Sequence, residues 1–102
     1  MYGTVARIKV KPGMDEQLAE LSRTWARSEF ERSGQVAELI FKVDDRPDEY
    51  IIVAAFPDRV SYRTNAEHPA TNANYQRLRA LLVADPEWND GEIIDALGID
   101  GI

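Results

Sequence analysis

Few side chains in this sequence are of the types that most often carry chemistry. His68 is the single histidine, and the chain contains no cysteine. Without cysteine there is no disulfide, no thiolate metal site, no iron–sulfur cluster and no cysteine nucleophile. One histidine with scattered carboxylates does not make a zinc site, and no acidic spacing matches a calcium-binding loop. We therefore expect no metal site in this chain.

Other catalytic motifs are absent from the sequence as well. The six glycines are scattered, so no glycine-rich loop could cradle a phosphate group, and there is no GxSxG motif or Ser/His/Asp order. The formal net charge is -6, and no run of lysine and arginine offsets it locally. Because such a chain repels phosphate backbones, we expect no nucleic-acid partner.

Length and composition indicate one domain. The 102 residues suffice for one hydrophobic core, and 44% of them are apolar. The expected domain covers residues 1–97, with a C-terminal tail at 98–102. No run approaches the ~18 apolar residues of a membrane span, and the start MYGTVARIKV lacks the apolar core of a signal peptide. We expect a cytoplasmic protein with no membrane partner.

Hydrophobic periodicity predicts the first half of the fold. Residues 2–10 alternate with the period of two that is typical of a strand. After a Pro-Gly turn, a stripe of apolar side chains recurs at helical spacing. The stripe consists of Met14, Leu18, Leu21 and Trp25. The helix is expected to end before the Ser-Gly pair at 33–34, and two strands at 35–43 and 50–56 then form a hairpin.

Two further helices and a last strand complete the predicted order. Asp58 is a good N-cap for a short helix at 59–66, and Pro69 suits the first position of the next helix. The apolar side of that second helix consists of Tyr75, Leu78, Leu81 and Leu82. The Asp-Pro pair at 85–86 is expected to end it, and the last strand is predicted at 91–97.

This order of elements is the split βαβ pattern. It predicts an α+β, ferredoxin-like fold, in which a four-stranded antiparallel sheet carries its helices on one face. Residues 50–56 are all apolar or aromatic, so the strand needs burial on both of its faces. We therefore expect a homodimer that forms through the other sheet face. The alternative is a monomer whose second face is half-polar because it carries Glu38 and Lys42.

Several segments resemble a known superfamily. These are IKVKPGMDEQL at the first strand-to-helix turn, the apolar strand that ends in Phe56, FPDRVSYRTNAEHP, and NDGEII near the C-terminus. Over nearly the whole chain, the sequence resembles the dimeric α/β-barrel superfamily and, within it, the antibiotic-biosynthesis-monooxygenase-like domains. The resemblance implies two ferredoxin-like subunits that form a dimeric α/β barrel. Because fold alone does not carry function, the reaction needs a separate argument.

For chemistry, the resemblance implies an oxygenase that needs no cofactor, in which the substrate's own phenolate or enolate reacts with O₂. Such a protein binds the substrate in an apolar pocket between sheet and helices, deprotonates it and excludes water. Matched by position, the catalytic candidates are Tyr62, Asn65 and His68. The substrate-binding candidates are Trp25, Tyr75 and Arg79.

Each candidate also has a purely structural interpretation. Trp25 and Tyr75 continue the apolar stripes of their helices, and Tyr62 could be ordinary packing. His68 precedes a helix start, where it could cap the helix. Asn65 could bond to its own backbone, and Arg79 could pair with Glu87 or with water.

Two features narrow the resemblance. The haem-degrading branch of the superfamily has an asparagine, a tryptophan and a histidine ligand where this chain has Ala6, Asn65 and Tyr75, so we do not expect haem degradation. Trp88, in the segment DPEWNDGE, is expected at the dimer edge, and its alternative position is the mouth of the pocket.

Three functions therefore remain open. The leading one is an oxygenase that acts on a small aromatic or polyketide-like compound. The alternative is a non-catalytic homodimer that binds a small-molecule ligand or simply assembles, because the sequence offers no convincing general base. A ferredoxin-like regulatory domain that binds amino acids fits the strand order, but the glycine-rich ligand loop expected of it is missing.

Overall fold

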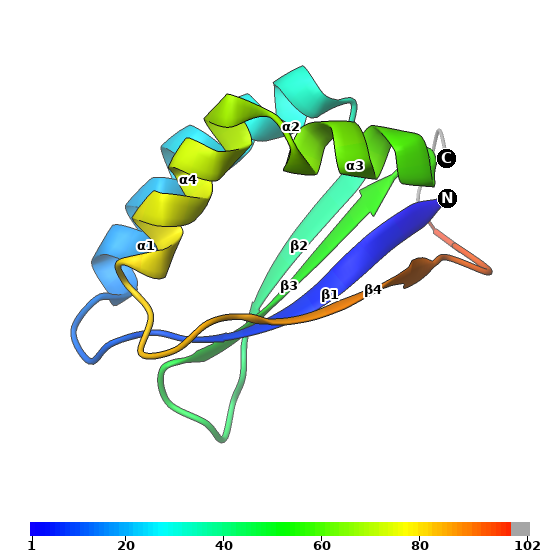
Figure 1. The fold of residues 1–102 in the computed structure, drawn as a ribbon. Coiled ribbons are helices and arrows are strands. Elements are labelled where there is room, and N and C mark those ends of the chain that lie inside the picture. The colour runs from blue at the N-terminus through cyan, green and yellow to red at the C-terminus, as the bar shows by residue number, and fades with distance from the viewer. Residues whose placement is uncertain (99–102) are drawn as a thin grey trace.

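The structure, a computed structural model, describes residues 1–98 as a sheet with helices layered over one of its faces (Figure 1). The four strands are β1 (Tyr2–Lys9), β2 (Ala37–Lys42), β3 (Glu49–Phe56) and β4 (Glu87–Glu92). They pair antiparallel throughout, in the order β2-β3-β1-β4. The predicted α+β ferredoxin-like fold is confirmed. Apart from Gly98, the predicted tail at 98–102 lies outside the described residues.

The helices come in two groups that lie over the same face of the sheet (Figure 1). Between β1 and β2 the chain forms α1 (Asp15–Leu21), a π-helical segment η1 (Ser22–Ala26) and α2 (Arg27–Ser33) without a break. Between β3 and β4 it forms α3 (Arg59–Ala66) and α4 (Pro69–Arg79). Within residues 1–98, no helix combines the length and the apolarity needed to cross a membrane.

The predicted helix ends are formed by local chemistry. Asp58 Oδ1 accepts a hydrogen bond of 2.7 Å from the backbone N–H of Ser61 and thereby caps α3. Pro69 occupies the first turn of α4, as predicted. Gly34 ends α2 with a φ of 75°, a left-handed conformation that glycine adopts without steric cost.

The position of the last strand was predicted wrongly. β4 covers residues 87–92 instead of 91–97, and its side chains are all exposed. Its polar sequence gives no strand signal, because the strand is formed by backbone pairing with β1, in which Glu92 lies opposite Tyr2 and Glu87 opposite Arg7. Hydrophobic periodicity cannot detect a strand of this kind.

The end of α4 also differs from the prediction. The helix ends at Arg79, well before the Asp-Pro pair at 85–86. Leu82 leaves the helical path and forms a β-bridge with Val10, where both side chains are almost fully buried. Tertiary burial of Leu82 therefore outweighs the helical periodicity on which the prediction rested.

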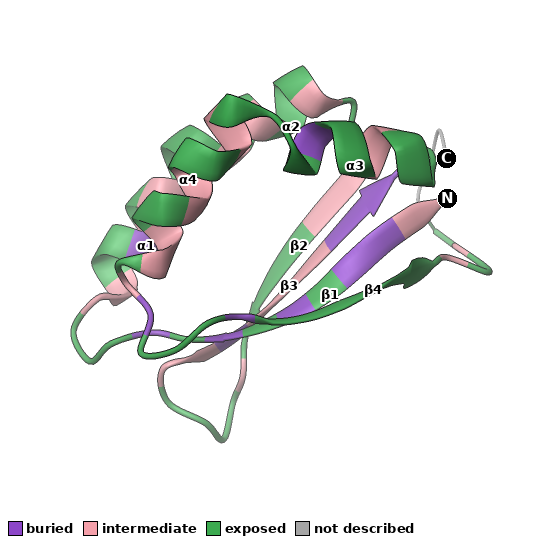
Figure 2. Cartoon of the chain, viewed as in Figure 1, coloured by how far each residue is buried: buried purple, intermediate pink, exposed green. Residues whose placement is uncertain are grey.

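The hydrophobic core lies at one end of the space between sheet and helices. It consists of Ile8, Val10, Leu18, Tyr50 and Leu82. At the other end of the same strands the helix-facing side chains include the smaller Thr4 and Ala54. Figure 2 shows buried residues running along β1 and β3, the two central strands. Large side chains thus fill one end of the sandwich and small ones leave space at the other.

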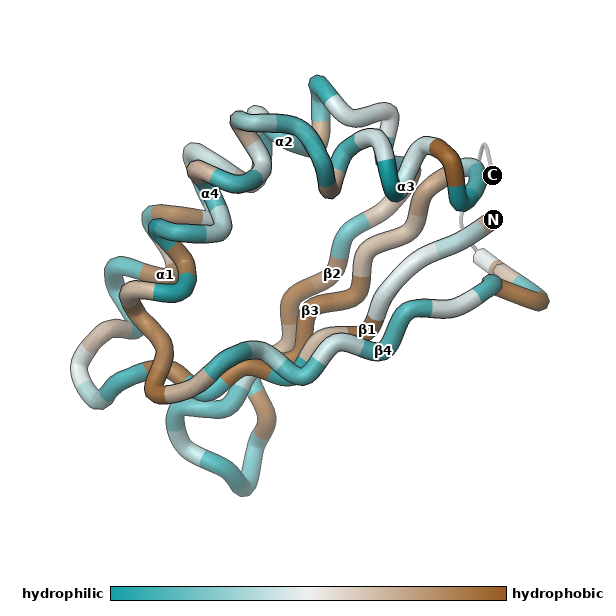
Figure 3. Tube along the Cα trace, in the orientation of Figure 1, coloured by the Kyte–Doolittle hydropathy of each residue, from teal (hydrophilic) through white to brown (hydrophobic). Residues whose placement is uncertain are grey.

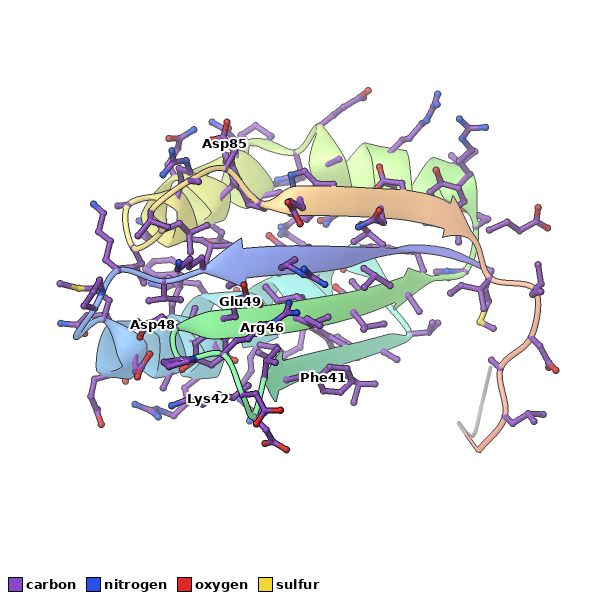
Figure 4. The ribbon with its side chains drawn as sticks, turned by 90° about the horizontal axis from the view of Figure 1, so that it is seen from below. Phe41, Lys42, Arg46, Asp48, Glu49 and Asp85 are labelled. Carbon is purple, nitrogen blue, oxygen red and sulfur yellow. The ribbon has the colours of Figure 1, made fainter. Side chains whose placement is uncertain are left out.

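The face of the sheet away from the helices is apolar on β2 and on the middle of β3, while β1 adds Val5 together with the charged Arg7 and Lys9. We call it the open face, and it carries Val5, Leu39, Phe41, Ile51 and Val53. Leu39, Phe41 and Val5 are 51%, 48% and 45% exposed. Figure 3 shows the hydrophobic colour concentrated on β2 and β3, and Figure 4 looks onto this face, with Phe41 labelled and the helices behind the sheet.

The monomer alternative assumed that Glu38 and Lys42 lie on the face of the sheet that the helices leave uncovered, and this assumption is wrong. The strand register puts Glu38 opposite Ala54 and Lys42 opposite Tyr50, and both partners face the helices. Glu38 and Lys42 therefore do not make the open face polar. The apolar side of β2 is the one left uncovered.

Two glycines that lie opposite each other provide a test of the strand packing. A Cβ on Gly3 would collide with the carbonyl oxygen of Ala54, whereas a Cβ on Gly91 would meet nothing within 4 Å. Gly3→Ala is therefore expected to lower the free energy of unfolding by about 1–3 kcal/mol, measured by urea denaturation. Gly91→Ala, the matched control, is expected to stay within about 0.5 kcal/mol of the wild type. Equal stability of the two variants would contradict the described approach of β1 to β3.

Candidate active site

An open cavity of about 500 Å³ lies between the sheet and the helices. Its floor includes Thr4, Ile52, Ala54 and Phe56 from the two central strands. Residues from both groups of helices form the walls, and β4 adds side chains at one edge. The size lies within the usual range for a small-molecule site. The small floor residues, together with a core that stops short of this end, explain why space remains here.

Aromatic rings surround the cavity. Trp25 on η1 and Trp88 on β4 line it and are 43% and 50% exposed, so each ring is half open to solvent. Tyr75 on α4 also lines it, with its ring centroid 6.4 Å from that of Trp88. The guanidinium of Arg77 stacks 3.9 Å from the centroid of the Trp25 ring. These flat surfaces suit a planar apolar ligand.

The π-helical segment η1 carries Trp25. Its wider turn interrupts the regular α-helical spacing, and segments of this kind are frequent at functional sites.

Trp88 lines the cavity, so it occupies the alternative position considered from the sequence, at the pocket.

Tyr62 on α3 reaches the cavity beside β4. Its hydroxyl donates a hydrogen bond of 2.9 Å to Asp90 Oδ1, and its ring packs against those of Tyr2 and Phe56. Burial and, next, the Asp90 carboxylate raise the pKa of Tyr62 to about 12. At neutral pH the Tyr62 side chain is therefore a neutral phenol that donates a hydrogen bond.

Asn65 is the buried amide of the site. Its Oδ1 accepts a 2.9 Å hydrogen bond from Thr71 Oγ1, and Thr71 in turn accepts one of 3.0 Å from Arg32. Because the amide oxygen of Asn65 is engaged, its NH₂ group is the part available to a ligand. This chain of hydrogen bonds joins α2, α3 and α4 at one end of the cavity.

His68 and Arg79 do not belong to the cavity wall. His68 is exposed and caps α4, with its Nδ1 accepting a 3.0 Å hydrogen bond from the N–H of Ala70. Arg79 Nε donates to Asp85 at 2.7 Å, and its Nη1 donates to the carbonyl of Leu82 at 3.1 Å. Of the six residues expected at the site, the structure thus brings Trp25, Tyr62, Asn65 and Tyr75 together.

Sequence reasoning missed three polar groups on the floor and its edges. The strand pairing sets Glu38 opposite Ala54, Ala54 opposite Thr4 and Thr4 opposite Asp90, so they form one row across the sheet. All four line the cavity. The signal in the sequence was that Thr4 alternates with Val5 and that Glu38 shares a side of its strand with Ile40, but the pattern alone does not say which face the helices cover.

Glu38 is the partly buried carboxylate of this row. Burial raises its pKa above the ordinary value, a hydrogen bond from Gln35 Nε2 at 3.2 Å lowers it in part, and the negative charge of Glu29 raises it. The sequence offered no convincing general base, and Glu38 now provides a candidate. Within the part of the chain that the structure describes, no three His, Asp or Glu side chains gather as they would around a metal ion.

The amino-acid sequence matches no protein-family model, and no curated protein matches it significantly. Solved structures, in contrast, match over most of the chain. SnoaB, a cofactor-independent oxygenase from Streptomyces nogalater, is 20% identical with a TM-score of 0.80, covering 95% of this chain and 96% of its own. A structure described as an antibiotic biosynthesis monooxygenase is 14% identical with a TM-score of 0.78, covering 93% and 100%. The chain has the antibiotic-biosynthesis-monooxygenase fold.

The same fold occurs in a conserved protein from Methanosarcina mazei Go1, which is 16% identical with a TM-score of 0.79 and covers 88% of this chain and 89% of its own. At such identities the likeness concerns the fold. Any reaction proposed for this chain must therefore be argued from its own cavity.

The pair of Tyr62 and Asp90 gives a titration test. Asp90→Asn removes the neighbouring negative charge, so the pKa of Tyr62 is expected to fall below about 12, while burial of the side chain keeps it above its ordinary value. Ultraviolet absorbance follows phenolate formation, and subtracting the titration of the matching Tyr62→Phe protein isolates this one tyrosine.

The raised pKa of Tyr62 also determines how the stability of the fold changes with pH. Because the pKa of Tyr62 is higher in the folded state, this group stabilises the fold below about pH 10, and that stabilisation is lost as the pH rises toward about 12. Tyr62→Phe lacks this loss. A Tyr62 that titrates identically with and without Asp90 would contradict the hydrogen bond described.

Proposed function

We propose that this chain is a cofactor-independent monooxygenase that acts on a small, planar aromatic or polyketide-like compound bound in the cavity. The main support is the cavity, which combines half-exposed aromatic walls with a few polar groups aimed inward. The shared fold with SnoaB, described as a cofactor-independent oxygenase, gives further support.

A reaction of this type balances without a reductant. In an anthrone-like substrate, an activated methylene group flanked by aromatic rings loses a proton, and the resulting carbanion reacts with O₂. One oxygen atom stays on the carbon as a new carbonyl group, and the other leaves as water with the two hydrogens of the methylene group. The substrate supplies all four electrons, so the protein needs only to bind, deprotonate and exclude water.

The cavity residues suit these tasks. Trp25, Tyr75 and Trp88 offer flat surfaces that orient a planar ring and displace water from it. The NH₂ group of Asn65 can donate to a developing phenolate or enolate oxygen. Tyr62, with a pKa of about 12, stays protonated at neutral pH and serves as a donor instead of as the base.

Oxygen consumption with 1,8-dihydroxyanthrone tests the proposal. The wild type is expected to consume one O₂ per substrate. Asn65→Ala is expected to lower kcat by about 10²-fold, because it removes a donor to the developing oxyanion. His68→Ala is expected to keep kcat and KM and to lower stability by about 0.5–2 kcal/mol, as loss of a helix cap would.

Three outcomes oppose the proposal. Binding without O₂ consumption would identify a non-catalytic ligand-binding domain, and absence of binding would remove the aromatic substrate. A large loss of kcat in His68→Ala, with the fold unchanged, would indicate that His68 transfers the proton.

We further propose that two copies pair through their open faces. Leu39 and Phe41 lie half exposed on an edge strand, beside Val5, Ile51 and Val53, and no helix within residues 1–98 covers them. A contiguous apolar surface of this kind usually marks an interface. The pairing leaves the cavity on the opposite side of each sheet accessible.

Sedimentation velocity tests the pairing at micromolar concentration. The wild type is expected to sediment as a dimer and Leu39→Glu as a monomer, because the charge would be buried without a partner. Val60→Glu is the control, since Val60 lies on α3, away from the open face, and is 73% exposed. A wild-type monomer, or a Leu39→Glu dimer, would overturn this part of the proposal.

A further inference from the structure

The row of side chains across the floor has a polar group on either side of a small residue. Glu38 comes from the edge strand β2, Ala54 from β3 and Thr4 from β1, and all three face the helices. Adjacent strands lie about 4.8 Å apart, so the Cα atoms of Glu38 and Thr4 are separated by about 10 Å. That separation suits a system of two or three fused rings lying on Ala54.

The Thr4 hydroxyl is an unsatisfied group at this floor. Thr4 is 94% buried, since 6% of it is exposed, and its Oγ1 has no hydrogen-bond partner within residues 1–98. The neighbouring Tyr62 hydroxyl donates to Asp90, and Thr4 lies close enough to that hydroxyl to lower the pKa of Tyr62 in part, although no hydrogen bond of acceptable geometry joins the two hydroxyls within residues 1–98. A buried hydroxyl without a partner is unfavourable, and a ligand oxygen placed over it would satisfy it.

Glu38 lies between the cavity and a second, outer groove. On one side it lines the cavity, and on the other it lines a groove of about 540 Å³ between β2 and the η1–α2 region. The hydrogen bond from Gln35 holds one of its oxygens, Oε1. The carboxylate can therefore face a ligand on one side and exchange protons with water on the other.

We propose that Glu38 is the base of the cavity, accepting a proton from a bound hydroxylated aromatic ketone, and that the Thr4 hydroxyl donates to an oxygen atom of the same molecule. The reaction assigned to Glu38 rests on the proposed function. The placement of the ligand on the floor does not depend on turnover.

The proton step balances as follows. The acidic C–H bond of the substrate breaks, its proton moves to a Glu38 carboxylate oxygen, and the electron pair stays on the substrate, delocalised onto the oxygen that faces Thr4. After O₂ adds to the carbon, the same proton returns to the peroxide oxygen. Loss of water from the hydroperoxide then gives the ketone and leaves Glu38 ionised for the next turnover.

The charged groups around Glu38 come from α2. Glu29 also lines the cavity and is paired with Arg32 at 3.8 Å, while Arg27 and Glu31 line the outer groove. Burial and Glu29 together raise the pKa of Glu38. A raised pKa makes the ionised carboxylate a stronger base than an exposed one, and it places the acid limb of the rate profile at a higher pH.

Oxygen uptake with 1,8-dihydroxyanthrone forms the first arm of the test, using the full chain. Glu38→Gln is expected to lower kcat by about 10²–10⁴-fold and to abolish the acid limb of the pH profile of kcat/KM. Thr4→Val, which keeps the shape of the side chain, is expected to raise KM about tenfold. Glu67→Gln is the matched control, because Glu67 is exposed beyond α3 and outside the cavity wall.

Equilibrium binding of 1,8-dihydroxyanthraquinone, which has no methylene group to oxidise, forms the second arm. We expect Kd to rise about tenfold in Thr4→Val, and the pH dependence of Kd seen in the wild type to disappear in Glu38→Gln. These effects without any O₂ uptake would uphold the ligand site and sink the proposed reaction. Failure of the wild type to bind the quinone, or binding that neither substitution changes, would overturn the inference, as would a Glu38→Gln variant that retains full kcat.

Discussion

The register of the central strand pair is the constraint on which this molecule depends. Thr4 lies opposite Ala54 and Val5 opposite Val53, so a single alternation decides what each face of the sheet presents. A shift by one residue would turn every side chain of a strand to the other face. The contact that excludes any side chain at Gly3 is made by this same strand pair. Both the cavity and the open face follow from this one alignment.

The side chains on the two faces of the sheet form different features. On the helix side, large core residues such as Ile8 and Leu82 close one end, while Thr4 and Ala54 leave the other end hollow. On the opposite side, β2 and β3 present an apolar surface to solvent. The fold therefore has a cavity on one face and an exposed apolar surface on the other. The proposed ligand binding and the proposed self-association would use different side chains.

Much of the fold could be predicted from periodicity and local chemistry. The alternation in β1, the all-apolar β3, the Asp58 cap and the proline at the start of α4 each specify their element locally. β4 could not be found in this way, because its polar residues form a strand only through backbone pairing with β1. Leu82 likewise lies outside the predicted helix, because it forms a buried bridge with Val10, which is far away in the sequence.

The site could be predicted in part for a related reason. Trp25, Tyr62, Asn65 and Tyr75 lie on helices whose order and facing follow from the pattern, so their convergence was foreseeable. Glu38 could not be assigned, because both sides of β2 carry apolar residues and only the sheet order shows which side meets the helices. The sequence thus contains a candidate base in Glu38, but it does not show that this side of β2 faces the helices.

Nuclear Overhauser contacts between bound 1,8-dihydroxyanthraquinone and the protein test most directly whether the row across the floor is a ligand site. We expect the ring protons of the ligand to contact the methyl groups of Ala54 and Thr4, and those of Leu39 on the far face to show none. Contacts confined to Leu39 and its neighbours, or an Ala54 methyl group that stays silent when the ligand is bound, would contradict the account.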